Sequence, residues 1–231
     1  MTDRFAPTAR TRPNRLRERV RDDVASVHAI LDAAALCHVG FAGPDGPVVL
    51  PTLHVRVGEV VYLHGSTGSW LGRLGAAPAP VCLTATCLDA LVLARSSFHH
   101  SVNYRSATVF GVPRLVSDRT EKLACLDALV DRMAPGRARA ARGPNARELA
   151  ATAVLALHVD EATAKVRAHG VKDDDEDLDH PVWAGLVPVL TSLGTPEPDG
   201  VPPVALPPDA LAPAWISVAP ITPDRCVHPA D

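Results

Sequence analysis

The segment Val60–Trp70 contains the residues whose types and spacing are best suited to bind a ligand. An apolar stretch runs directly into a loop of glycines and hydroxyl-bearing residues: Gly65, Ser66, Thr67, Gly68 and Ser69. The pattern from Trp70 to Gly75 predicts a helix, and the free amides at the start of a helix attract phosphate. Glycines also let a ligand approach the backbone closely. The segment therefore predicts either a phosphate site or an ordinary polar turn that caps a helix.

Common catalytic and metal-binding motifs do not match the sequence. The loop has neither the Gly-Lys-Ser/Thr ending of a P-loop nor a Gly-x-Gly-x-x-Gly fingerprint. No Ser-His-Asp order or nucleophile elbow is evident, which argues against a hydrolase. The five cysteines include no Cys-x-x-Cys pair, which argues against a zinc site or a redox dithiol. We expect no metal site and reduced, buried thiols.

Length and composition indicate one globular domain with terminal extensions. The chain has 231 residues, 47% of them apolar, and a net charge of −3. This charge balance suggests neither a nucleic-acid nor a membrane partner, and charged residues interrupt the apolar runs before membrane-spanning length. The opening segment is polar and arginine-rich rather than leader-like, so we expect a cytoplasmic protein.

Short apolar segments separated by tight turns predict an antiparallel barrel of six to eight strands with flanking helices. Helices are expected from about residue 20 to Ala35 and over Asp118–Met133. Expected strands are Cys37–Ala42, Pro47–Val57, Val60–His64, Cys82–Asp89, Ala90–Ser96, Ser106–Gly111, Ala151–Val159 and an edge strand Ala162–Ala168. The predicted organisation is a mobile arm over 1–17, a domain over 18–193 and a Pro-rich tail over 194–231.

The order of several motifs resembles the FMN-binding split-barrel proteins related to pyridoxamine 5′-phosphate oxidase. These motifs are the His64–Ser69 loop, the two segments that meet at Asp89, and Phe98–Gly111. The chain looks closest to the branch that includes the nitroimidazole-resistance proteins, and the similarity runs from about Glu18 to Leu190. The resemblance implies a split β-barrel, mainly β and antiparallel with flanking α-helices, that forms a homodimer with two cofactor sites at the subunit interface.

The resemblance also implies which residues bind the cofactor FMN. The flavin ring would lie against the strand and wall residues Val49, Leu50, Pro51, Thr52, Leu63 and His64. The phosphate would lie among Gly65, Ser66, Thr67 and Ser69, while Arg105, Ser106 and Trp183 would reach the flavin from the partner chain. Trp70 stands where a basic residue is expected, so either Arg73 or Arg105 supplies the positive charge or FMN binding is weakened. Pro51 lacks an N–H and suits a strand edge or a ligand-facing position.

Histidine supplies the other candidate chemistry, with ten in the chain. His64 is the candidate catalytic residue, as a proton donor or flavin contact, and His54 lies on the neighbouring predicted strand. Some split-barrel relatives bind haem, in which case His64, His99 or His100 would be the axial ligand. We expect an FMN-dependent oxidoreductase acting on a small molecule. The alternatives are a haem-binding protein, an F420-dependent reductase and a non-catalytic flavin-binding protein.

Overall fold

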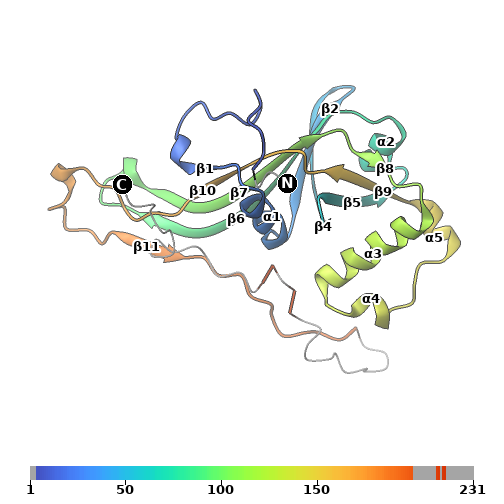
Figure 1. Cartoon of the computed structure of the whole chain (residues 1–231). Helices are drawn as coiled ribbons and strands as arrows, with labels where there is room; N and C mark the ends of the chain where they lie inside the picture. The colour runs from blue at the N-terminus through green and yellow to red at the C-terminus, as the bar shows by residue number, and fades with distance from the viewer. Residues whose placement is uncertain (1–3, 200–211, 214, 217–231) are drawn as a thin grey trace.

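A computed structural model describes residues 4–199, 212, 213, 215 and 216 of the chain. Eleven strands form two antiparallel sheets, with helices around them (Figure 1). The helices are α1 (Val24–Ala33), α2 (Trp70–Ala76), α3 (Arg119–Met133), α4 (Arg137–Ala140) and α5 (Ala146–Ala151), with short 3-10 turns η1 (Arg17–Arg19), η2 (Ser97–His99) and η3 (Asp175–Asp177).

The larger sheet runs in the order β1-β10-β7-β6-β2-β3, and β11 pairs with the far part of β6. Its strands are β1 (Val20–Arg21), β2 (Cys37–Gly43), β3 (Gly46–Thr52), β6 (Val81–Leu93), β7 (Ser101–Gly111), β10 (Glu161–Arg167) and β11 (Gly185–Pro188). The smaller sheet has the order β4-β5-β9-β8, formed by His54–Val57, Val60–Ser66, Thr152–His158 and Arg114–Leu115. This confirms the predicted mainly antiparallel split-barrel class, although the strand pairs described do not close into one continuous barrel.

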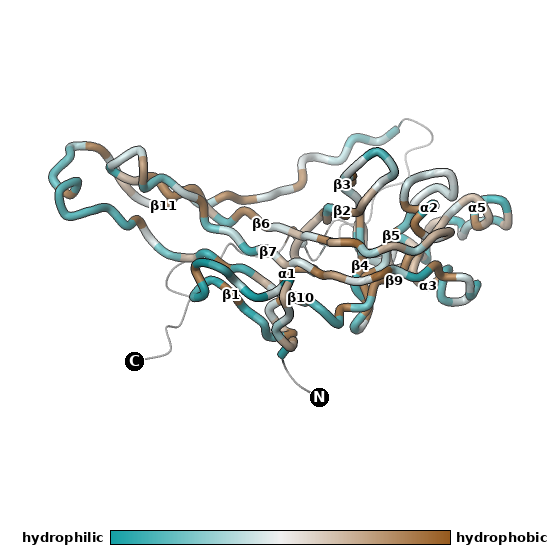
Figure 2. Tube along the Cα trace, turned by 90° about the horizontal axis from the view of Figure 1, so that it is seen from above, coloured by the Kyte–Doolittle hydropathy of each residue, from teal (hydrophilic) through white to brown (hydrophobic). Residues whose placement is uncertain are grey.

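One large apolar cluster joins the two sheets. Leu63 and Leu155 of the smaller sheet pack in the same cluster as Val39, Leu83 and Val109 of the larger one. Helix α1 adds Val27, Ile30 and Leu31 to this core, while α3 covers a second cluster on the smaller sheet. Brown, apolar positions accordingly gather along β6, β2, β5 and β9 where the two sheets meet (Figure 2).

Several predicted boundaries need correction. Helix α1 begins at Val24 rather than near residue 20, because Asp23 caps it by accepting a hydrogen bond from the Ser26 amide and β1 precedes it. The two strands expected on either side of Asp89 are one strand, β6, with a bulge between Leu88 and Ala90.

Strand β10 is not an edge strand, since the two-residue strand β1 pairs with its free side. Strand β3 ends the sheet instead. The segment predicted as one strand, Pro47–Val57, is interrupted at Leu53, where the chain passes from the larger sheet to the smaller. The count exceeds the six to eight strands expected, because β1, β8 and β11 have four residues or fewer and show no clear periodicity.

The described part of the N-terminal arm lies against the larger sheet. Phe5 is buried, its amide donates to Asp22 O, and Arg10 and Thr8 both contact the Glu161 carboxylate of β10. These contacts place the arm against the sheet. The mobility predicted for residues 1–17 stays a prediction. The three-part division of the chain into arm, domain and tail also stays a prediction.

The C-terminal tail returns to its own domain where it is described. The Trp215 indole N–H donates to Arg132 O at 3.2 Å. The apolar tail residues Leu206 and Leu211 lie outside the described part of the chain. No helix among the described residues has the length and apolar character needed to cross a membrane.

Candidate functional site

The Gly65–Ser69 loop is built as a helix cap. The Ser69 hydroxyl donates to Ser66 O at 2.6 Å and accepts from the Gly72 amide at 3.2 Å, which satisfies one amide of the first turn of α2. A Cβ at Gly72 would lie 2.2 Å from Thr67 O, so the close approach of loop and helix requires glycine there. A Cβ at Gly65 would lie 2.9 Å from the Ser69 hydroxyl, whereas a Cβ at Gly68 would make only an ordinary 3.9 Å contact with the Ser66 hydroxyl. The loop therefore caps helix α2, which is one of the two roles that the sequence predicts for it.

The same loop retains polar groups that a phosphate could use. Thr67 is exposed, and its hydroxyl has no partner among the described residues. Ser66 is also exposed, and its hydroxyl accepts only the long 3.3 Å bond from the Gly68 amide. Helix α2 has only seven residues, so its dipole adds little. Capping and phosphate binding are therefore compatible, with Ser66 and Thr67 rather than Ser69 as the available hydroxyls.

Arg73 supplies an accessible cation beside this loop. Its guanidinium carbon lies 4.1 Å from the centroid of the Trp70 ring, and the residue is exposed. No carboxylate among the described residues forms an ion pair with Arg73. The Trp70 ring in turn packs 5.8 Å from Phe41 and against the β2–β3 hairpin near Gly43. Trp70 thus joins the loop to strand β2 of the hairpin, and Arg73 carries the nearby positive charge.

Strand β3 offers an open, mostly apolar surface. Val49 is 63% exposed and Pro51 is exposed, whereas Leu50 and Thr52 alternate with them and point toward the interior. A shallow depression of about 390 Å³ follows the hairpin from Gly40 to Val49. A flat ring could rest on Val49 and Pro51. Leu50 and Thr52 could contribute mainly through their backbone.

The adjacent wall residues are less accessible than the resemblance implied. Leu63 is completely buried in the core, so only its backbone could meet a ligand. His64 is half-buried, its Nδ1 is enclosed and has no hydrogen-bond partner, and burial lowers its pKa. No hydrogen bond within the described chain accounts for this buried ring nitrogen of His64.

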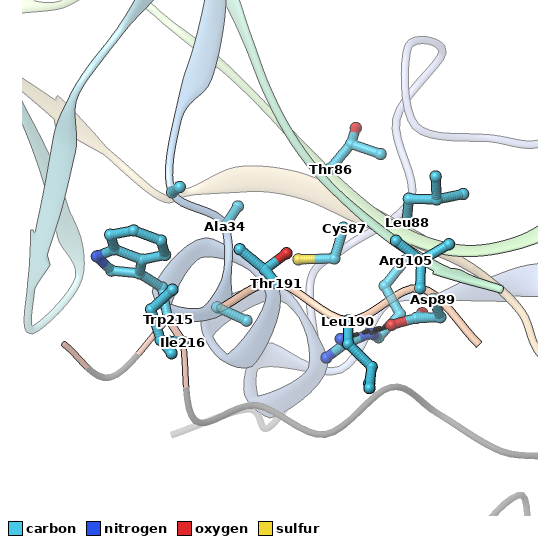
Figure 3. A pocket seen from close by; sticks show the side chains of 13 residues that line it. Ala34, Thr86, Cys87, Leu88, Asp89, Arg105, Leu190, Thr191, Trp215 and Ile216 are labelled. Atoms are coloured by element: carbon cyan, nitrogen blue, oxygen red, sulfur yellow. Dashed lines mark hydrogen bonds and ion pairs between the residues drawn. The ribbon is translucent and has the colours of Figure 1, made fainter. Parts of the chain in front are cut away.

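Arg105 is not available as a phosphate cation in its own chain. It is 8% exposed, and its Nε and Nη2 donate to the Asp89 carboxylate, the shortest bond being 2.7 Å (Figure 3). Burial acts to lower the pKa of Arg105, but the hydrogen bonds and charge of Asp89 outweigh it and raise the pKa. Of the two arginines that the sequence proposed, only Arg73 is therefore free.

The Asp89–Arg105 pair faces a cavity of about 380 Å³ between the sheet and the returning tail. Figure 3 shows the Cys87 thiol directed toward Thr191, with Leu190 beside the ion pair and Trp215 beside Ile216. Burial raises the pKa of the Cys87 thiol, so this thiol stays protonated at neutral pH. The cavity is thus lined by a neutral thiol and by an arginine whose charge Asp89 already neutralises.

Ser106 and Trp183 lie apart from the loop in the same chain. Ser106 follows Arg105 on β7 and therefore faces the opposite side of the sheet, where it lines a different cavity. Trp183 is 63% exposed and packs over Gly185 at the start of β11, at the opposite end of the molecule from α2 (Figure 1). Either residue could complete the loop site only from a second chain.

The histidines differ in burial and in the hydrogen bonds that hold their rings. His54 is completely buried, and one ring nitrogen contacts Leu31 O at 2.7 Å. Burial, followed by the charge of Arg132, lowers its pKa to about 4. His54 is therefore a core residue in this structure, and its side chain does not reach the surface.

His99 and His100 lie beside the turn between β6 and β7. His99 Nδ1 contacts the Ser96 hydroxyl at 2.8 Å, and its ring lies within 4.0 Å of carboxylate oxygens of Asp174 and Asp177. His100 Nδ1 lies 2.9 Å from Ser96 O. A carbonyl can only accept, so His100 carries its proton on Nδ1 and presents the Nε2 lone pair outward.

Two features escaped sequence reasoning. Asp89 was interpreted as a strand break, although an acidic residue at a bulge opposite an arginine could have suggested a buried pair. The acidic run over residues 173–179 also makes contacts that its composition does not predict, because Asp173 pairs with Arg95 at 2.8 Å and Asp174 and Asp177 approach His99. No local signal links the acidic run to Arg95 and His99, because they are more than 70 residues apart in the sequence.

Solved structures similar to this chain cover most of its length. The flavocytochrome Anf3 from Azotobacter vinelandii is 40% identical, with a TM-score of 0.83 over 90% of this chain and 97% of that one. The FAD and haem binding protein from Mycobacterium smegmatis is 39% identical, with a TM-score of 0.77 over 83% and 95%. A protein assigned provisionally to 5-nitroimidazole antibiotic resistance in Bacteroides thetaiotaomicron is 24% identical, with a TM-score of 0.51 over 64% and 86%, and supports the fold.

No curated protein matches the sequence significantly. The profile of the pyridoxamine 5′-phosphate oxidase family matches residues 23–166, which include the β2–β3 hairpin, the Gly65–Ser69 loop and strands β6 to β10. This match covers more than half of the chain and agrees with the two antiparallel sheets. The chain therefore belongs to the pyridoxamine 5′-phosphate oxidase family.

Proposed function

We propose that this protein is a flavin-dependent redox protein that also binds haem. The observation that carries the proposal is the 39–40% identity, over most of the chain, to a flavocytochrome and to an FAD and haem binding protein. A flavin supplies hydride and one-electron chemistry, and haem supplies one-electron chemistry, so the protein needs mainly to bind and orient them. The absence of a strong acid–base constellation among the described residues is compatible with this role.

The flavin half of the proposal is supported by the groups around strand β3. Val49 and Pro51 form an open apolar surface for a ring, while Ser66, Thr67 and Arg73 offer two hydroxyls and a cation to a phosphate. FMN and FAD share this part of their structure. Our expectation of FMN therefore becomes a proposal for the riboflavin phosphate portion, and the relatives favour FAD as the complete molecule.

The haem half of the proposal favours His100 as the axial ligand. Histidine ligands in metal sites usually donate their second ring N–H to a carbonyl or carboxylate, which fixes the ring and its tautomer. His100 has this arrangement through Ser96 O, and it is exposed. His99 is held by Ser96 and two aspartates, and His64 is enclosed, so both are weaker candidates. His64 stays a candidate proton donor to a flavin substrate.

A homodimer would complete the flavin site, because Ser106 and Trp183 lie away from the loop of their own chain. We propose that both reach the flavin of the partner chain, as the family resemblance implied. Sedimentation of the purified protein tests this assembly. A monomer that keeps full flavin occupancy would contradict it, and Trp183→Ala is expected to weaken flavin binding only if the dimer forms.

The cofactor content itself is tested by purification with added riboflavin and a haem precursor. We expect flavin and Soret absorption together, and chromatography of the released flavin distinguishes FAD from FMN. His100→Ala should lose the haem signal and retain flavin, whereas the exposed control His158→Ala should retain both. A protein that takes up neither cofactor would overturn the proposed function. Native haem ligation that persists in His100→Ala and is lost in His64→Ala would overturn the assignment of His100 as the axial ligand.

A further inference from the structure

A second polar cavity lies beneath the N-terminal arm. It has a volume of about 450 Å³, within the range of roughly 300–1,000 Å³ typical of small-molecule sites. Residues 10–16 of the arm form one side, and strands β7 and β10 form the other. In Figure 1 the arm lies beside β1 and β10, while α2 and its loop lie at the other end of the molecule. Within one chain, this cavity is distinct from the loop site.

Positive charge dominates the lining of this cavity, which contains four cationic residues and no carboxylate: Arg10, Arg12, Arg15 and Lys165. Arg10 is neutralised by Glu161. Arg12, Arg15 and Lys165 are exposed and form no ion pair with any residue that the structure describes. Three positive charges are thus uncompensated around one hollow.

Hydroxyl and apolar groups complete the lining. Ser106 and Thr163 have hydroxyls without partners in the described chain, while Thr108 shares a 3.3 Å contact with Thr84. Val20 and Phe110 provide apolar surface on the same wall. Guanidinium groups and hydroxyls suit phosphate oxygens, and the apolar surface suits the organic part of a phosphorylated molecule.

Two further arginines adjoin cavity residues in the sequence, although neither lines the cavity. Arg167, two residues beyond Lys165, is only 5% exposed, and its Nε has no hydrogen-bond partner. Arg19, which directly precedes Val20, has the same deficiency at its own Nε, and its nearest carboxylate, Glu18, is 3.9 Å away. Burial, followed by the charge of Arg19, lowers the pKa of Arg167. Arg167 Nη1 donates to Asn103 Oδ1, and Arg19 is only partly buried, so these two residues add positive charge beside the cavity without themselves contacting its contents.

The arm is also held in an uncommon backbone conformation at this cavity. Leu16, which lines it, has φ 55° and is the only non-glycine residue with positive φ in the described chain. Such strain persists where surrounding contacts enforce it, and it is concentrated at binding sites. The arm is therefore shaped around the hollow.

We propose that this cavity binds the diphosphate group of a nucleotide, with Arg12, Arg15 and Lys165 contacting the phosphate oxygens. Two sources share this chemistry. One is FAD held at the flavin site of a second chain, whose diphosphate, which includes the riboflavin phosphate, would then lie between that chain's loop and this cavity. The other is a separate nucleotide, such as a reduced dinucleotide that delivers electrons to the flavin. The proposal rests on the proposed function only in the first case.

The test compares Arg12→Ala/Arg15→Ala with Arg17→Ala/Arg139→Ala, which removes the same charge from exposed positions outside the cavity. Circular dichroism checks that both variants fold. Calorimetric titrations then measure the affinities of FAD and FMN for apoprotein and of ADP for both apoprotein and FAD-loaded protein. Losing the arginine contacts should weaken diphosphate binding by roughly tenfold for each arginine.

The two sources give different results. If FAD supplies the diphosphate, the cavity variant loses FAD affinity but not FMN affinity, and FAD-loaded protein does not bind ADP. If a separate nucleotide binds, FAD-loaded protein binds ADP, and only that affinity falls in the cavity variant. Either pattern supports the proposal.

The proposal is overturned if the cavity and control variants have the same affinities for ADP, FAD and FMN as the unmodified protein, or if ADP does not bind and FAD binds no differently from FMN. Failure of the flavin function gives a separate result: the protein then binds neither flavin but still binds ADP through Arg12 and Arg15.

Discussion

Arg105 and Arg73 differ in what surrounds their charges. Arg105 lies inside the larger sheet, where Asp89 accepts its hydrogen bonds at distances down to 2.7 Å. Arg73 is exposed, and its guanidinium stacks on the Trp70 ring without an ion pair to any described residue. The same contrast separates His54, bonded to Leu31 O in the core, from Thr67, whose hydroxyl is exposed.

This comparison indicates that the interior uses polar groups to stabilise the fold, and the edge keeps them free for a ligand. A charge that a buried partner already neutralises cannot also neutralise a phosphate. Changes in the interior should therefore act on the free energy of unfolding, whereas changes at the edge should act on ligand affinity.

The largest effect is expected for Asp89→Ala, which leaves the buried Arg105 charge unpaired. The free energy of unfolding should fall by about 3–5 kcal/mol, measured by urea denaturation. Asp22→Ala, which breaks a pair with the exposed Arg4, should cost at most about 1 kcal/mol. The double variant Asp89→Leu/Arg105→Met should recover much of the loss. A fall no larger than that of Asp22→Ala would contradict a structural role for the pair.

The next effect concerns pH and His54. Its pKa is about 4 in the folded protein, against 6.5 for an unperturbed histidine, so the unfolded chain binds a proton first as the pH falls. Stability should therefore be full above pH 6.5 and decrease down to about pH 4, by on the order of 3 kcal/mol. Urea denaturation at a series of pH values measures this decrease. It should shrink in His54→Gln and persist in His158→Gln; equal profiles in the two variants would refute the assignment.

The smallest effect on stability is expected at the edge. Arg73→Ala should change the free energy of unfolding by no more than about 0.5 kcal/mol, because the side chain is exposed. It should weaken FMN binding by roughly tenfold through loss of a charged phosphate contact. Arg119→Ala, also exposed but on α3, is the control for fluorescence titration with FMN. Equal FMN affinities in the two variants would remove Arg73 from the site.

Sequence reasoning predicted much of the fold because local signals determine it. The Gly43–Gly46 turn, the alternating strands and the long helix α3 have periodicities that need no tertiary information. The short strands β1 and β11 were missed because two to four residues show no period. They form only because β10 and β6 provide hydrogen-bonding edges.

The candidate site was less predictable because accessibility depends on distant partners. Nothing near Arg105 in the sequence shows that a bulge places the Asp89 carboxylate against it. The position of Leu63 next to the loop likewise suggests that it contacts the flavin ring, but its side chain is enclosed by core residues from both sheets. Residue type and spacing identified the hydroxyl-rich loop, whereas the three-dimensional environment decided which arginine is free.

Strand β3 has a further consequence for self-association. An open sheet edge can pair with the edge of another molecule and begin aggregation. Residues 47, 49 and 51 direct their backbone nitrogens to the same side of the strand, and two of them are prolines. Proline is tolerated where that side faces away from the neighbouring strand, so the open edge offers one N–H donor where an ordinary strand would offer three. Pro47 and Pro51 thus leave the edge accessible to a flat ligand while making it a poor template for polymerisation.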